Sequence, residues 1–134
     1  MHRFEQFAEF DDLMARTQLF DHIGGLARTC REHGIQLVVL NNAVHPIALQ
    51  ELPHGRDDYA RFVDALRAAA DAAGVPFFNP APDGIGDPDL FQDSVHHNAA
   101  GTKWLSEQIA HFLVERGLLG QPPSSGPTPA HGAI

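Results

Sequence analysis

Two short apolar segments, residues 35–40 and 75–79, are separated by a single helical pattern. The first segment, Ile-Gln-Leu-Val-Val-Leu, is rich in branched side chains, which is typical of a strand buried on both faces of a parallel sheet. Between the segments, residues 57–73 place apolar side chains at helical spacing before Gly74 ends the pattern. A strand, a helix and a strand in this order join neighbouring parallel strands whose carboxyl ends lie at the same edge. The sequence therefore predicts an α/β fold with a short parallel sheet.

The remaining segments predict further helices around this unit. Apolar residues recur at helical spacing over residues 3–15, 17–33 and 98–116, whereas residues 43–56 and 80–92 are broken by Pro and Gly and are expected to be loops. Helices should cover both faces of the sheet. A chain of 134 residues has room for one domain. We assign that domain to residues 1–117 and expect residues 118–134, rich in Pro, Gly and Ser, to be disordered.

Charge and hydropathy exclude several classes of partner. The formal net charge is -8 and the basic residues form no cluster, so nucleic acid is not an expected partner. No segment approaches the roughly 20 apolar residues that a membrane-spanning helix needs. The first seven residues are too polar and acidic for a signal peptide. The sequence as given therefore indicates a soluble, cytoplasmic protein.

The densest group of titratable residues follows the second predicted strand, in the segment Asp93-Ser94-Val95-His96-His97-Asn98. An Asp three residues before a His can turn its carboxylate onto the imidazole Nδ1–H, which leaves Nε2 free to accept a proton. The alternative is structural, with a turn at Asp93, ordinary loop histidines and Asn98 as the N-cap of the last helix. Because the segment follows the carboxyl end of a predicted parallel strand, where open α/β sheets bind ligands, we favour a functional role.

At Asp93, His96, Asn98 and Gly101 the sequence resembles the last conserved block of the SGNH/GDSL hydrolase superfamily, an Asp-x-x-His followed by Asn or Pro, a Gly and the final helix. The order of elements over residues 17–116 is similar as well. The resemblance implies a partial flavodoxin-like, SGNH-type three-layer sandwich. It also implies that His96 acts as general base and acid and that Asp93 orients it.

The resemblance further implies the class of substrate. The sequence looks closest to members of the polysaccharide-acetylation type, so we expect a small ester, with acetylated carbohydrate as the candidate. No cofactor and no resident metal are expected. Three side chains near the same sheet edge are candidate substrate contacts, namely Asn42, His45 and His97.

The sequence departs from the family at the nucleophile. The Gly-Asp-Ser segment is absent, as are the segments that supply a Gly and an Asn to the oxyanion hole. The chain has four serines, Ser94, Ser106, Ser124 and Ser125. We reject Ser94, because one loop would have to present both nucleophile and base in reactive geometry. Asn41 and Asn42 could donate to an oxyanion, but we interpret them as turn residues.

Three hypotheses remain from the sequence. In the first, the chain is the C-terminal part of an SGNH/GDSL-type ester hydrolase or O-acyltransferase, inactive alone, whose open sheet edge is covered by a partner chain or a second copy. In the second, it is a non-catalytic α/β interaction module. In the third, it is a small metal-binding protein, with zinc held by His45, Asp93, His96 and His97.

Overall fold

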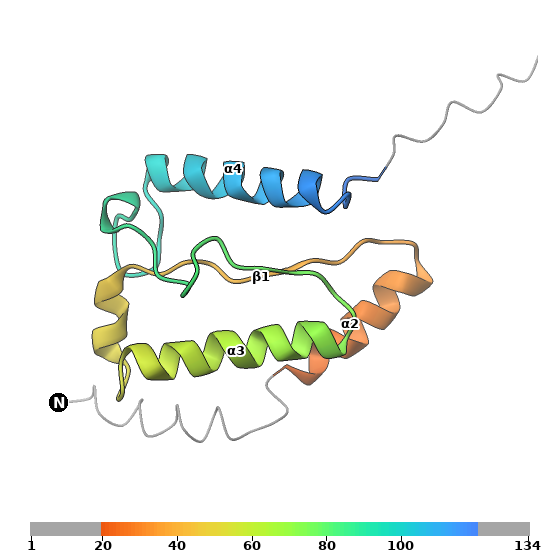
Figure 1. Ribbon diagram of the computed structural model, residues 1–134, viewed down its shortest axis with the longest axis horizontal. Coiled ribbons are helices and arrows are strands. Elements are labelled where there is room, and N and C mark those ends of the chain that lie inside the picture. The colour runs from red at the N-terminus through yellow and green to blue at the C-terminus, as the bar shows by residue number, and fades with distance from the viewer. Residues whose placement is uncertain (1–19, 121–134) are drawn as a thin grey trace, which may run out of the picture.

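A computed structural model describes residues 20–120 of the chain. In this range the α-helices and strands follow the order α2 (Asp21–Glu32), β1 (Val39–Leu40), α3 (Arg56–Ala72), β2 (Phe77–Phe78) and α4 (Ala99–Glu115) (Figure 1). Two 3-10 helices, η1 (Pro46–Glu51) and η2 (Pro88–Leu90), lie in the connections. The helix expected at residues 3–15 and the tail from residue 121 lie outside the described residues.

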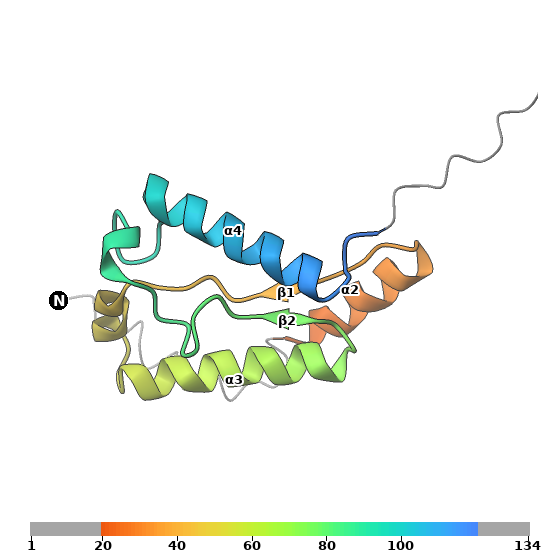
Figure 2. The same cartoon turned by 45° about the horizontal axis from the view of Figure 1, so that its top comes forward.

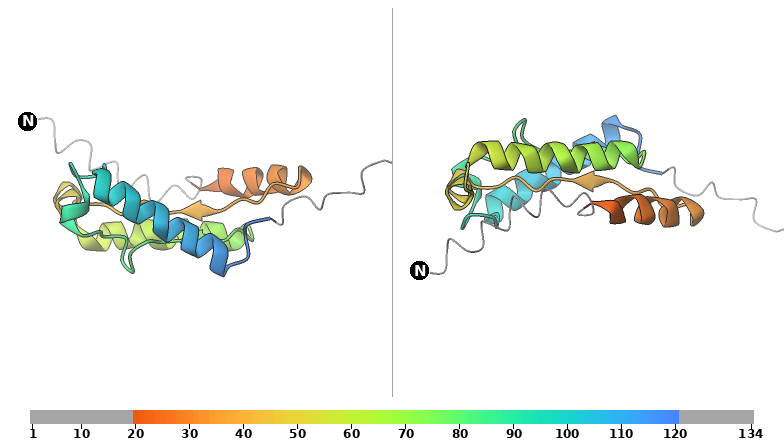
Figure 3. Two further views of the ribbon diagram at one scale, coloured as in Figure 1. Left: turned by 90° about the horizontal axis from the view of Figure 1, so that it is seen from above. Right: turned by 90° about the horizontal axis from the view of Figure 1, so that it is seen from below.

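The two strands form a parallel sheet with helices on both faces, as the sequence predicted. Val39 lies opposite Phe77 and Leu40 opposite Phe78, and the strands run side by side in Figure 2. Helix α4 covers one face, and α2 and α3 cover the other (Figures 1 and 3). The described part of the chain is therefore a small α/β fold of three helices and a two-stranded parallel sheet.

The strands are shorter and more exposed than predicted. Only two residues of each strand form the ladder, although the apolar runs span residues 35–40 and 75–79. Ile35 is 59% exposed and Leu40 is 42% exposed, so the interpretation of residues 35–40 as a strand buried on both faces is wrong. The N–H of Ile35 is used to close α2, where it donates to the Cys30 carbonyl at 2.8 Å. Leu40 is exposed because no further strand flanks β1 among the described residues.

The two long helices agree with the sequence prediction to within one residue at each end. Helix α3 buries Tyr59, Val63 and Ala70 along one face. Helix α4 is capped by Asn98, whose Oδ1 accepts a hydrogen bond from the Gly101 N–H at 2.9 Å. The sequence predicted both the helical spacing and the N-cap. These helices therefore form where local helix preference and the burial of one face agree.

The loop over residues 43–56 contains a regular element that the sequence pattern did not predict. The imidazole Nδ1 of His45 accepts a hydrogen bond from the Ile47 N–H at 2.9 Å, and Pro46 occupies the first position of η1. This side-chain cap and the fixed φ of proline start the 3-10 helix. His45 and Pro46 thus order part of the loop.

A buried amide joins the ends of both strands to helix α3. Asn41 is 5% exposed, and its Nδ2 donates to the Tyr59 hydroxyl at 3.1 Å and to the Asn79 Oδ1 at 3.2 Å. The Tyr59 hydroxyl donates to the Gly84 carbonyl at 3.2 Å. At Gly84 φ is +75°, and a Cβ there would lie 2.7 Å from the Asn41 Nδ2. The interpretation of Asn41 as a turn residue is therefore wrong.

No helix within residues 20–120 is both long enough and apolar enough to cross a membrane.

Candidate functional site

The Asp93–His96 segment is a small closed loop between η2 and α4. Phe91 and His97 form an isolated antiparallel bridge across its base, and the Gln92 N–H donates to the His96 carbonyl at 2.9 Å. Inside this closure the Asp93 Oδ1 accepts the Val95 N–H at 2.9 Å and the His96 N–H at 2.7 Å. These two backbone hydrogen bonds therefore fix the position of the Asp93 carboxylate without any contribution from the imidazole.

The other carboxylate oxygen contacts the imidazole. The Asp93 Oδ2 lies 2.8 Å from the His96 Nδ1. An ionised carboxylate can only accept a hydrogen bond, so Nδ1 must carry the proton and the neutral ring presents Nε2 as its free base. The His96 side chain is 70% exposed and the Asp93 side chain 50% exposed. The pair has the geometry of an oriented general base that a reacting group can reach from solvent.

The hydrogen bonds to Asp93 should be visible in its titration. Backbone hydrogen bonds from Val95 and His96, and then the side-chain bond from His96, lower the pKa of Asp93 from 3.8 to about 2. Carboxyl-detected NMR on the intact chain should therefore place the midpoint for Asp93 near 2, with Asp93→Asn identifying the resonance. Because the pKa is depressed in the folded state, this carboxylate stabilises the fold above pH 3.8, and the contribution is lost as pH falls through about 2.

One variant separates the contribution of the backbone N–H groups to the lowered pKa of Asp93 from that of the imidazole. His96→Ala keeps both backbone donors and removes only the imidazole, so the pKa of Asp93 should rise part of the way toward 3.8. A midpoint near 3.8 in the unmodified protein would mean that the turn around Asp93 does not form in solution.

Neighbouring elements hold this loop against the rest of the fold. The His45 N–H donates to the Ser94 carbonyl at 3.1 Å, which links the loop to the segment after β1. On the other side the Asn98 Nδ2 donates to the Asp89 carbonyl at 2.7 Å. A Cβ at Gly101 would overlap the Leu90 carbonyl oxygen, so the first turn of α4 approaches the loop more closely than a side chain would allow. Asn98 and Gly101, two residues of the motif, thus act in packing and capping.

A hollow of about 330 Å³ lies beside Asp93. Its lining includes His45, Ile47, Glu51, Phe91, Asp93 and Ser94. The His45 ring meets Phe91 edge to face, with ring centroids 5.8 Å apart. Of the three candidate substrate contacts, His45 is the one that lines this hollow.

The other two candidates lie elsewhere. The His97 ring stacks on Phe91 with centroids 4.4 Å apart, and its Nε2 is buried without a hydrogen-bond partner in the described part of the chain. Burial lowers the pKa of His97, which favours a neutral, packed ring. Asn42 is exposed, and its carbonyl lies 3.4 Å from the Tyr59 hydroxyl. Neither residue lines the hollow beside Asp93.

The serines in the described range are not joined to His96. The Ser94 carbonyl accepts from His45, and no hydrogen bond links the Ser94 hydroxyl to His96 within residues 20–120. The Ser106 hydroxyl donates to the Thr102 carbonyl at 2.8 Å, within α4. Ser124 and Ser125 lie outside the described residues.

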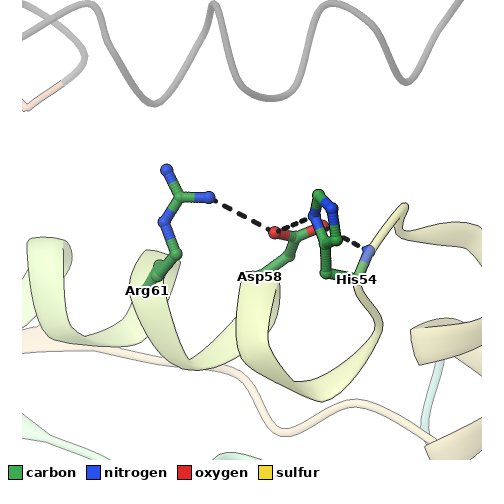
Figure 4. Close-up of polar contacts among 3 residues, drawn as sticks. All are labelled: His54, Asp58 and Arg61. Carbon is green, nitrogen blue, oxygen red and sulfur yellow. Dashed lines mark hydrogen bonds and ion pairs between the residues drawn. The ribbon is translucent and has the colours of Figure 1, made fainter.

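A second histidine–carboxylate cluster lies at the start of α3 (Figure 4). The Asp58 Oδ2 accepts the His54 N–H at 2.8 Å, and its Oδ1 lies 3.2 Å from the His54 Nδ1 and 3.4 Å from a guanidinium nitrogen of Arg61. Burial raises the pKa of Asp58, but the His54 hydrogen bonds and the charges of His54 and Arg61 outweigh it, so the pKa lies below its ordinary value. The Asp58 carboxylate satisfies an N–H before the first turn of α3.

The zinc set considered from the sequence is not assembled. Within residues 20–120, no three or more His, Cys, Asp or Glu side chains are placed to hold one metal ion. His45 has its Nδ1 occupied by the Ile47 N–H, and His97 is packed against Phe91.

Comparison of the chain with protein-family models, with curated proteins and with solved structures found no match. The resemblance to the SGNH/GDSL superfamily therefore rests on the residues of the motif and on the order of elements alone.

Proposed function

We propose that this chain supplies the Asp–His half of an SGNH/GDSL-type serine ester hydrolase or O-acyltransferase site, and that the serine comes from a partner chain. On this proposal the α/β unit is the later part of a flavodoxin-like three-layer sandwich. A small ester, with acetylated carbohydrate as the candidate, is its substrate.

One observation carries the proposal. The Asp93 carboxylate is fixed by two backbone N–H groups and holds the His96 Nδ1 at 2.8 Å, while the imidazole is 70% exposed. This arrangement selects the tautomer that has a basic Nε2, as a serine hydrolase requires. The Asp58–His54 contact differs, because the Asp58 side chain is 1% exposed and also lies against Arg61.

The chemistry assigned to the pair is proton transfer. The His96 Nε2 would take the proton of the serine hydroxyl as the oxygen attacks the ester carbonyl, and would then give it to the departing alkoxide. Water would repeat the cycle on the acyl-serine, or an acceptor hydroxyl would do so in a transferase. Asp93 would stay ionised throughout and stabilise the imidazolium.

The outer edge of β1, which no other strand covers within residues 20–120, supports the need for a partner. The Val39 N–H and the Asn41 N–H donate toward β2, so in a parallel ladder the peptide groups of Leu40 point to the opposite side. Leu40, at this edge, is 42% exposed. An apolar strand with unpaired peptide groups is a template for another strand. We propose that strands carrying the nucleophile pair there.

A complementation assay tests the proposal. The partner is an amino-terminal fragment of an SGNH/GDSL hydrolase that carries the Gly-Asp-Ser segment and the first three strands but stops before its own Asp-x-x-His block. Each polypeptide alone should be inactive toward p-nitrophenyl acetate and unlabelled by a serine-directed fluorophosphonate. The mixture should show both turnover and labelling of the partner's serine.

Two results would contradict the proposal. Labelling and turnover by this chain alone would place the nucleophile within it and overturn the rejection of Ser94. A complex that assembles, as shown by light scattering, yet remains inactive would favour the non-catalytic interaction module.

A further inference from the structure

A groove runs along the other edge of the sheet, away from the Asp93–His96 loop. It has a volume of about 450 Å³ and is lined on its floor by β2 and its flanking residues, with Arg67 of α3 on one side and Phe112 and Arg116 at the end of α4 on the other. We infer that this groove, the β2 groove, binds an extended acidic peptide segment as an added strand beside β2.

Free peptide groups form the floor of the groove. The Val39 N–H donates to the Pro76 carbonyl and the Asn41 N–H to the Phe78 carbonyl, so these carbonyls face β1. In a parallel ladder the intervening residue, Phe77, turns its N–H and C=O to the outer edge. No backbone partner accepts or donates at Phe77 in the part of the chain that the structure describes. A free edge of this kind is what strand addition uses.

An arginine stands over an aromatic ring on each side of this edge. The Arg67 guanidinium lies 5.3 Å from the centre of the Phe77 ring, and the Arg116 guanidinium lies 5.4 Å from the centre of the Phe112 ring. The Phe78 ring packs on Phe112 with centroids 4.7 Å apart, so the two arginines belong to opposite faces of β2. Stacking on the rings limits the freedom of both side chains and so reduces the entropy lost when they bind a carboxylate.

The positive charge of the β2 groove favours an acidic peptide. The chain has a net charge of -8, but the groove lining has two arginines against the single acid Asp71. Neither Arg67 nor Arg116 forms an ion pair within residues 20–120. Side chains of an added strand alternate between the faces of the sheet. Carboxylates on neighbouring residues would therefore reach Arg67 on one face and Arg116 on the other.

The chain's own carboxyl-terminal segment does not fit this chemistry. Residues 121–134 contain no Asp or Glu side chain. Residues 3–15 do contain acidic side chains, but their apolar spacing predicts a helix rather than an extended strand. We therefore assign the groove to a segment of another protein with at least two acidic residues in an extended stretch of about five, the length of floor that residues 75–79 provide.

Fluorescence polarisation on the full chain tests this inference. The probe is a fluorescein-labelled, amidated octapeptide in which pairs of adjacent glutamates alternate with pairs of valines, so that neighbouring carboxylates point to opposite faces of the strand. A second probe of the same sequence carries N-methyl groups on two adjacent central amides, which blocks both edges of the strand and leaves the charge unchanged. The protein should bind the first probe, and the methylated probe should bind at least about tenfold more weakly.

Variants locate the site. Arg67→Gln combined with Arg116→Gln should weaken binding of the first probe about tenfold, since each exposed ion pair contributes a few-fold in affinity. Arg28→Gln, which removes an exposed arginine of α2, is the matched control and should leave the affinity unchanged.

Several outcomes would overturn the inference. Equal affinity for both probes would mean simple charge attraction without strand addition, and an unaffected Arg67/Arg116 double variant would place the peptide elsewhere. Absence of binding to either probe would exclude an acidic strand. A dimer detected by light scattering and lost in the double variant would assign the groove to a second copy of this chain.

Discussion

Replacing His96 with alanine is expected to lower ester hydrolysis by the complemented enzyme about a thousandfold or more, to the level of the partner without this chain. On the proposed function, the substitution removes the group that accepts the serine proton, and members of a catalytic triad act as a unit. The measurement is the initial rate with p-nitrophenyl acetate at saturating complex, read together with the fluorophosphonate labelling rate, because both depend on the nucleophilicity of the serine.

The matched control is another exposed histidine–carboxylate pair. The His111 Nδ1 on α4 lies 3.4 Å from a Glu115 carboxylate oxygen, and the His111 side chain is 66% exposed. His111→Ala should leave turnover unchanged. Equal losses from His96→Ala and His111→Ala would show that the effect reflects assembly or stability and would contradict the role assigned to His96.

Asp93→Asn sharpens the same test. The amide can donate to Nδ1, which would place the imidazole proton on Nε2 and remove the free base from the face that meets the serine. Turnover should fall by two to four orders of magnitude, while imidazole ¹⁵N shifts report the exchanged tautomer. Wild-type tautomer populations together with low activity would assign Asp93 a purely structural part.

The order of elements and the bounds of α3 and α4 could be predicted because their causes are local. Apolar residues at helical spacing, Gly74 after one helix and Asn98 before the other act within a few residues of where they stand. The Asp93–His96 contact was predictable for the same reason, because three residues separate its partners.

The lengths of the strands could not be predicted, because they depend on what lies beside them. Residues 35–40 have the composition of a fully buried strand, yet only Val39 and Leu40 enter the ladder. Burial of the rest would need a neighbour on the outer edge of β1, and a sequence pattern does not reveal whether that neighbour is present. The position of His97 is equally non-local, since the Phe91 bridge determines which of two adjacent histidines turns inward.

The role of Asn41 was missed for a related reason. Its partners Tyr59 and Asn79 are 18 and 38 residues away, and an Asn-Asn pair after a strand has the composition of a turn. One clue was available in the sequence. Asn79 follows the second strand as Asn41 follows the first, and the carboxyl ends of parallel strands meet at one edge.

Asn41→Leu is therefore expected to lower the free energy of unfolding by about 2 kcal/mol. The substitution keeps the number of side-chain heavy atoms but leaves the Asn79 Oδ1 without its donor and takes one partner from the Tyr59 hydroxyl. A buried polar group left unpaired costs about 1–3 kcal/mol. Urea denaturation followed by circular dichroism measures the change. Asn42→Ala, at the exposed neighbouring position, should cost less than about 0.5 kcal/mol.

Combining Asn41→Leu with Tyr59→Phe tests whether Asn41 stabilises the fold through its hydrogen bond to the Tyr59 hydroxyl. If Asn41, Tyr59 and the Gly84 carbonyl stabilise the fold together, the two substitutions combined should cost less than the sum of their separate effects, by about 0.5 kcal/mol or more. Additive losses would mean that Asn41 and Tyr59 contribute independently. Asn41→Leu could instead destabilise the fold no more than Asn42→Ala does. That result would show that only the β1–β2 ladder and helix packing hold the strand ends.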